Sequence, residues 1–133
     1  MRNFLLDTSA VLTLRDDEPG ADRVAKLLAG QQTKKWRVYA CFFTSFEILY
    51  RVWKDEGEAA GRLAHAQCLA LPLEWVEFSD ELLLASARLK ATAAISVADA
   101  WIAAAAVQAG ATLVHKDPEL SALKLTQEAL PFK

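Results

Sequence analysis

The chain has 133 residues, of which 53% are hydrophobic, and a formal net charge of -2 at pH 7. This length suits one domain with a proper core, and the hydrophobic content excludes a disordered protein. The slightly negative charge excludes recruitment of nucleic acid by an overall basic field, so any contact with RNA or DNA has to come from a local patch or a metal ion.

The sequence gives no indication of export or membrane insertion. The apolar start at residues 2–14 is interrupted by Asp7 and no cleavage pattern follows, so we do not expect a signal peptide. The alanine-rich run at 100–106 is too short to span a bilayer, and we expect no membrane association. Cys41 and Cys68 form neither a CxxC pair nor a disulfide framework, which favours the reducing cytoplasm.

The first third of the chain predicts two strands and two helical segments. Residues 3–6 form a short apolar run typical of a buried strand. We expect a helical turn over 9–14 and, after a loop, a helix over 21–29 that stops at Gly30. The run "VYACFF" at 38–43 predicts a second strand.

A basic cluster precedes that second strand. Lys34, Lys35 and Arg37 surround Trp36. The cluster could follow an RNA backbone with one aromatic platform, and a solvated loop explains it equally well.

The middle of the chain predicts a helical pair. The motif "TSFE" has the form of a capping box with Thr44 as N-cap, opening a helix that runs to residue 54 or 56. A second helix covers 58–71 and ends at Pro72. A third strand at 74–78 and a helix over 80–90 follow.

The last third repeats the strand and helix pattern. "SVAD" is a second capping box, with Ser96 as N-cap and Asp99 at the third helical position, and its helix ends at Gly110. A fourth strand at 111–115 ends before Lys116, Asp117 and Pro118, and "EALPF" at 128–132 is a candidate edge strand. Strands that alternate with helices predict an α/β fold around a mostly parallel sheet of four or five strands, in one domain over residues 1–133.

Four carboxylates are expected at one edge of this sheet. Asp7 and Asp117 follow strand ends, while Glu47 and Asp99 lie in the first turns of helices. Carboxyl ends of parallel strands and the helix starts that follow them share one edge, where ligands usually bind. Clustered carboxylates repel one another unless a cation joins them, and Mg²⁺ or Mn²⁺ prefers such oxygen ligands. The pattern predicts metal-assisted attack on a phosphodiester.

Each carboxylate also has a simpler interpretation. Glu47 and Asp99 fit helix caps worth about 1 kcal/mol, and Asp117 before Pro118 fits a turn. Asp7 is the hardest to explain in this way, because a carboxylate among apolar residues needs a partner.

Five neighbouring polar residues are candidate supporting groups. Thr8 and Ser9 could orient water or bind phosphate, or cap the next turn. Ser96 could support Asp99 or serve only as N-cap. His115 could contact phosphate or transfer a proton, or be a hydrogen-bonded structural residue. Glu119 could reach the metal or lie in a solvated loop.

Three blocks together resemble PIN-domain ribonucleases, in particular VapC-type toxins: "FLLDTSAVL", "TSFEILYRV" and "ISVADAWIAAAAVQAGATLVHKDPEL". The resemblance covers essentially the whole chain. It implies a three-layer α/β/α fold, Mg²⁺- or Mn²⁺-dependent RNA cleavage, a homodimer and inhibition by a cognate antitoxin. The family's acidic site falls on Asp7, Glu47, Asp99 and Asp117, with Asp7, Asp99 and Asp117 as metal ligands. The chain departs from the family at His115, where Thr or Ser is common, and at Glu119, where a further acid is often Asp.

Two alternatives to a nuclease remain. The same fold could be a catalytically silent module that binds a metal or a protein. A phosphatase that uses Asp7 as nucleophile would need a second Asp two residues on, where this chain has Ser9.

Overall fold

The computed structural model describes residues 2–131, which form five short strands and six α-helices. The strands are β1 (Asn3–Leu6), β2 (Arg37–Cys41), β3 (Glu74–Val76), β4 (Thr112–His115) and β5 (Gln127–Ala129). The helices are α1 (Thr8–Arg15), α2 (Ala21–Gln32), α3 (Phe42–Glu56), α4 (Glu58–Ala70), α5 (Asp80–Thr92) and α6 (Val97–Gln108), with a 3-10 helix, η1 (Pro118–Ala122), before β5.

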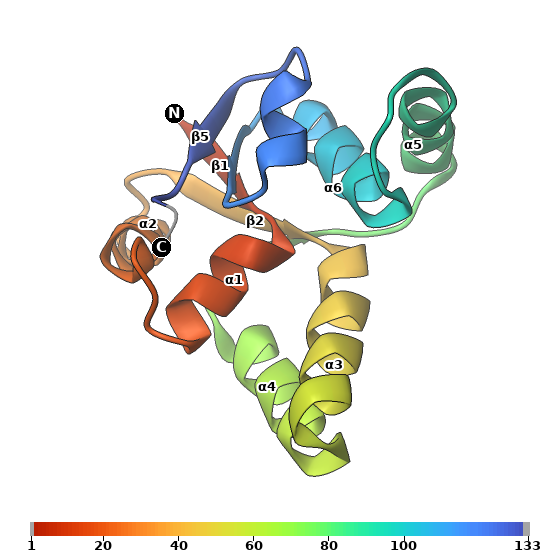
Figure 1. Ribbon diagram of the computed structural model, residues 1–133. Helices are drawn as coiled ribbons and strands as arrows, with labels where there is room; N and C mark the ends of the chain where they lie inside the picture. Colours follow the sequence, from red (N-terminus) through yellow and green to blue (C-terminus); the bar gives the residue numbers. More distant parts are fainter. Residues whose placement is uncertain (1, 132–133) are drawn as a thin grey trace.

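All strand pairs are parallel, and the sheet order is β3-β2-β1-β4-β5 (Figure 1). The first strand therefore lies at the centre, with Leu5 in register with Tyr39 of β2 and Leu113 of β4. Beyond β1, the backbone N–H of Asp7 donates to the carbonyl of Val114 at 3.0 Å. The chain leaves the sheet at Asp7 with its position fixed by the neighbouring strand.

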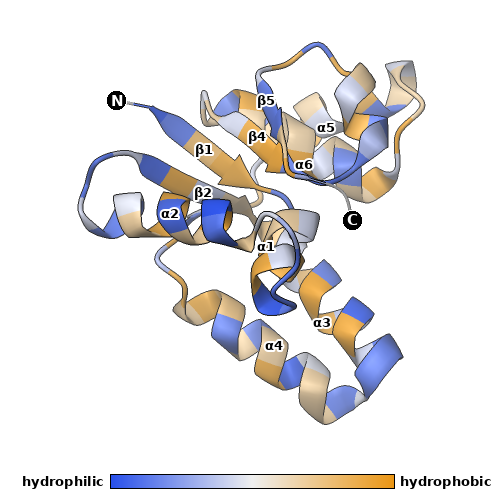
Figure 2. Ribbon diagram, turned by 60° about the vertical axis from the view of Figure 1, so that its left-hand side comes forward, coloured by the Kyte–Doolittle hydropathy of each residue, from blue (hydrophilic) through white to orange (hydrophobic). Residues whose placement is uncertain are grey.

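Alternating residues of β1 serve two separate cores. Phe4 and Leu6 pack with residues of α1, α2, α3 and α4, whereas Leu5 packs with residues of α5 and α6. Strands buried on both faces are continuous apolar runs, as Figure 2 shows for β1. The predicted α/β class and its helix-covered parallel sheet are confirmed. Figure 1 shows α3 and α4 as an antiparallel pair that extends away from the sheet.

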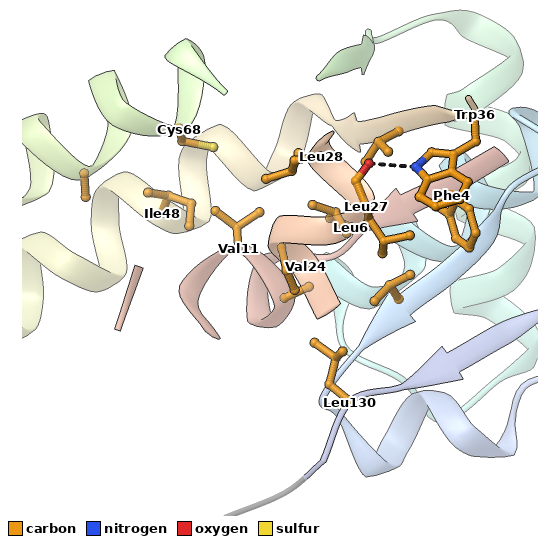
Figure 3. Packing of buried hydrophobic residues seen from close by; sticks show 14 of the residues in the cluster. Phe4, Leu6, Val11, Val24, Leu27, Leu28, Trp36, Ile48, Cys68 and Leu130 are labelled. Carbon is orange, nitrogen blue, oxygen red and sulfur yellow. Dashed lines mark hydrogen bonds between the residues drawn. The ribbon is translucent and has the colours of Figure 1, made fainter. Parts of the chain in front are cut away.

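Trp36 lies in the first of these cores, so the aromatic platform considered for the basic cluster is not formed. Its side chain is 7% exposed, its ring meets Phe4 edge-on at 5.5 Å, and its Nε1–H donates to the Leu27 carbonyl at 2.7 Å (Figure 3). The solvated loop that was the alternative is what precedes β2.

Gly30 was wrongly predicted as a helix stop. It lies inside α2, which continues to Gln32. A Cβ atom at this position would lie 2.1 Å from the Trp36 ring. The glycine therefore makes room for the indole and does not end the helix.

The start of α3 is the second correction. "VYACFF" was expected to be a strand and Thr44 the N-cap, but β2 ends at Cys41 and α3 begins at Phe42. Phe42 and Phe43 pack their rings against Trp101 of α6, at 5.2 and 6.4 Å between centroids. A short apolar run has no periodicity that separates strand from helix, and here the contact with α6 decides.

The remaining elements agree with the sequence to within a few residues. The strand at 74–78 is shorter than expected, and α5 continues to Thr92. The edge strand exists as β5, while residue 132 of "EALPF" lies outside the described residues. Within residues 2–131, no helix has the length and apolar character needed to cross a membrane.

Candidate functional site

Asp7 is a buried carboxylate at the carboxyl end of β1. It is 3% exposed and serves as the N-cap of α1, where its Oδ1 accepts the Ala10 N–H at 2.9 Å. Oδ1 also accepts the Ser9 hydroxyl at 2.6 Å. Burial raises the pKa of Asp7 to about 7, and the charges of Asp117 and Glu47 add to this rise.

Ser9 links the ends of the two central strands. While its hydroxyl donates to Asp7, its oxygen accepts the backbone N–H of Lys116 at 2.8 Å, just after β4. Neither Thr8 nor Ser9 caps α1, because Asp7 has that role. Ser9 instead holds Asp7 and the chain that leads to Asp117 in one network.

Glu47 lies beyond the first turn of α3, so its predicted role in a capping box is wrong. It is 8% exposed, and its Oε1 accepts the buried Thr8 hydroxyl at 2.6 Å. The Thr8 hydroxyl oxygen also lies 3.2 Å from that of Thr44, one turn earlier on α3. Thr44 was expected to be the N-cap of this helix. Because α3 begins at Phe42, Thr44 instead lies inside the helix, where its hydroxyl is close to this carboxylate.

Asp99 enters from the start of α6, where the predicted cap is confirmed. The Ser96 Oγ accepts the backbone N–H of Asp99 at 3.1 Å. This bond uses the backbone of Asp99, whose side chain is 7% exposed. The Ser96 hydroxyl also contacts the Asp99 carboxylate and favours its charged form, so Ser96 both caps the helix and supports Asp99. Burial raises the pKa of Asp99 to about 7, and its contact with the Asp117 carboxyl group adds to the rise.

Asp117 and Glu119 come from the loop after β4. The half-buried Asp117 accepts the Glu119 N–H at 2.9 Å and so caps η1. One carboxylate oxygen each from Asp99, Asp117 and the exposed Glu119 lie within 4.8 Å of one another. Glu119, for which a solvated loop was the alternative, belongs to this tight group, whereas Asp7 and Glu47 lie outside it.

His115 is fully buried behind the loop and does not face the site. Its Nδ1 accepts the backbone N–H of Asp117 at 3.1 Å, and its Nε2 lies 2.7 Å from Oε1 of Gln127. Of the interpretations left open for His115, the hydrogen-bonded structural residue fits this geometry. Gln127 was not identified from the sequence, because its partner is on a neighbouring strand.

Among the described residues, no cationic side chain forms an ion pair with the cluster. Across residues 2–131 no ion pair joins Asp7, Glu47, Asp99 or Asp117 to a Lys or Arg. Lys116, the nearest lysine in sequence, turns its Nζ to Glu18 and the Pro19 carbonyl. Buried like charges without a counter-charge suit a cation, and the all-oxygen donor set of Asp99, Asp117 and Glu119 suits a hard divalent ion.

Comparison with known families gives one match that covers most of the chain. A sequence model of the PIN domain matches residues 4–125. A comparison with curated proteins gives no match.

Several solved structures share the fold. A chain of VapBC2 from Rickettsia felis, bound to a DNA fragment from its promoter, is 18% identical with a TM-score of 0.76, over 97% of this chain and 99% of that chain. DNA-bound VapBC from Salmonella typhimurium is 19% identical with a TM-score of 0.74, over 97% of this chain and 98% of that chain. VapBC-5, a member of the VapBC family of toxin-antitoxin systems from Mycobacterium tuberculosis, is 21% identical with a TM-score of 0.61, over 99% of this chain and 100% of that chain.

Proposed function

Because this chain belongs to the PIN domain family, we propose that it is a Mg²⁺- or Mn²⁺-dependent endoribonuclease and the toxin of a toxin–antitoxin pair. The observation that carries the proposal is the convergence of Asp7, Glu47, Asp99 and Asp117 on one edge of the sheet without a cationic partner. Structural neighbours that are VapBC complexes support the toxin assignment.

We assign the residues of the site separate roles, according to their positions. Asp99 and Asp117 would hold the cation, with Glu119 or Asp7 completing its oxygen ligands. A bound divalent ion polarises the phosphate and supplies a nucleophile from water. Ser9 fixes the Asp7 carboxylate and Thr8 fixes that of Glu47, so both acids keep their orientation before substrate arrives.

The test is RNA cleavage by purified protein freed of any partner. Cleavage should need Mg²⁺ or Mn²⁺, stop with EDTA and return when metal is added back. Asp7→Asn and Asp99→Asn should each lower the rate by at least about 100-fold, because each removes a charge from the site. The matched control is Glu58→Gln, an equivalent change at an exposed carboxylate paired with Arg62 on α4.

Two results would contradict the proposal. Full activity of Asp7→Asn or Asp99→Asn would remove the acidic site from the reaction. Metal binding without cleavage of any structured RNA would favour the silent binding module. The phosphatase alternative gains no support, since Ser9 occupies the place of the second acid and donates to Asp7.

A groove beside the site suits an antitoxin segment. A cavity of about 200 Å³ between α1, α3 and α4 is mostly apolar and is lined by Val11, Leu14, Ile48, Ala64, Cys68 and Leu71 among others. We place the apolar face of an antitoxin helix there. Co-purification of this chain with the product of a neighbouring gene, and inhibition of cleavage by that product, is the check.

A second copy of the chain is the other partner we propose. Six rings form a continuous chain of contacts across α3, α6 and the loop after β3; this aromatic face comprises Phe42, Phe43, Phe46, Tyr50, Phe78 and Trp101. Phe46 and Phe78 are 57% and 55% exposed. Contiguous exposed apolar surface of this kind marks a protein interface.

A further inference from the structure

His115 is the point at which the chain departs from the family's Thr or Ser, and its surroundings give it a defined task. The ring is completely buried, so it cannot touch RNA. It lies at the end of β4, two residues before Asp117, and it contacts a backbone group of one proposed ligand and a side chain of β5.

The two hydrogen bonds determine which ring nitrogen donates and which accepts. Nδ1 faces the Asp117 backbone N–H, which can only donate, so Nδ1 must be an unprotonated acceptor. Nε2 then carries the proton and donates to Oε1 of Gln127, whose own amide nitrogen donates to the Leu123 carbonyl at 3.0 Å. Both ring nitrogens therefore have a hydrogen-bond partner.

Side chains also satisfy the neighbouring backbone of the loop. The N–H of Lys116 is held by Ser9, that of Asp117 by His115 and that of Glu119 by the Asp117 carboxylate. A loop whose amides are paired in this way has few other conformations available. Two oxygen donors, from Asp117 and Glu119, are therefore presented in a fixed arrangement toward Asp99.

We infer that His115 is a positioning residue: its ring, oriented by Gln127 of the edge strand, fixes the backbone at Asp117 and so sets the spacing of the Asp117 and Glu119 carboxylates for the cation. The inference rests on the proposed function in that these carboxylates are taken as metal ligands. It adds that β5, which supplies none of the acids of the site, helps to orient the ring through one hydrogen bond.

Two substitutions test the hydrogen bonds of the two ring nitrogens separately. In His115→Asn, the Asn Oδ1 stands as many bonds from Cα as Nδ1 and can accept the Asp117 N–H. In His115→Gln, the Gln Nε2 stands as many bonds from Cα as the ring Nε2 and can donate to Gln127. Both variants replace the ring with an open-chain amide and lose similar packing, so each is the control for the other. His115→Leu removes both bonds.

The measurement is Mn²⁺ affinity by titration, together with thermal unfolding of the metal-free proteins. We expect His115→Asn to bind Mn²⁺ within about 3-fold of the parent, and His115→Gln and His115→Leu to bind about 10- to 100-fold more weakly, as is usual when a partner of a metal ligand is removed. A purely structural role would lower both affinity and stability in proportion for all three variants, which would overturn the inference.

Nitrogen NMR of the metal-free parent tests the ring itself, whether or not the protein cleaves RNA. Long-range ¹H–¹⁵N correlations of His115 should show a protonated Nε2 and an unprotonated Nδ1. A proton on Nδ1 would overturn the inference and leave the nuclease proposal intact. Failure of the parent to bind Mn²⁺ would instead contradict the proposed metal site, and the NMR result would still decide whether His115 holds Asp117.

Discussion

Asp7 is both a helix cap and a member of an acidic cluster. A cap needs only one oxygen, and Oδ1 takes both the Ala10 N–H and the Ser9 hydroxyl. The other oxygen has no hydrogen bond within residues 2–131 and is left for the site. This division explains why a charge follows directly on the apolar residues of β1.

The raised pKa values of Asp7 and Asp99 predict how stability depends on pH when metal is absent. Each is about 7 in the folded chain and near 3.8 when unfolded, so the folded state binds more protons in between. Stability therefore falls as pH rises from about 4 to about 7. Thermal unfolding in EDTA should occur several degrees lower at pH 8 than at pH 5.

Substitution and metal provide the checks on this pH dependence. Asp7→Asn removes one of the two carboxylates and should reduce the difference between pH 5 and pH 8. Mn²⁺ should raise the unfolding temperature more at pH 8 than at pH 5, because protons compete for the same oxygens. An EDTA-treated protein more stable at pH 8 than at pH 5 would contradict the raised pKa values.

Sequence reasoning selected the four acids because each was expected to follow a strand or to open a helix, positions that the topology brings together. It could not identify Thr44 or Gln127. Each acts on a residue distant in the sequence or on another strand, at a distance that depends on packing. It assigned Glu47 to the site and misjudged the helix start that places it there.

At the scale of elements, one close contact joins α2 to the residue before β2, and the sequence of neither segment predicts this contact by itself. Gly30 in α2 leaves space for the Trp36 ring, which precedes β2 and reaches back to the Leu27 carbonyl. Glycine inside a helix normally signals its end, so the local pattern suggested the wrong role. The packing of Trp36 against α2 therefore depends on the absence of a Cβ atom at position 30.

Gly30→Ala should therefore destabilise the protein. The added Cβ overlaps the indole and forces Trp36 from its site, which we expect to cost about 1–3 kcal/mol of unfolding free energy. Gly110→Ala is the control, since a Cβ there meets nothing within 4 Å and only its φ of +60° is unfavourable. Urea unfolding measures both, and a Gly30→Ala protein as stable as the parent would show that the indole has room to move.

At the scale of the whole molecule, the fold class followed from alternating strands and helices, and the sheet order confirms it. The interfaces could not be predicted in the same way. Phe42 and Phe43 were assigned to a strand, so the aromatic face was not visible before the start of α3 was known. On α3, Tyr50 and Trp53 are exposed whereas Ile48 and Val52 are buried.

Assembly through the aromatic face can be tested by one charge. Phe46→Asp should convert a dimer to a monomer in light scattering coupled to gel filtration, because an interface core disfavours a buried unpaired charge. Leu63→Asp is the matched control, since Leu63 is 59% exposed on α4, outside the aromatic face. A dimer that persists in Phe46→Asp would place the contact between copies elsewhere.

The central position of β1 also determines when the acids can meet during synthesis. Residues 4–6 pair with 112–114, so the middle of the sheet stays incomplete until β4 has left the ribosome. Asp117 and Glu119 follow later still. A nascent chain therefore carries Asp7 and Glu47 without the donors that would complete a cation site, and the acidic cluster can be completed only after the last strands have been translated.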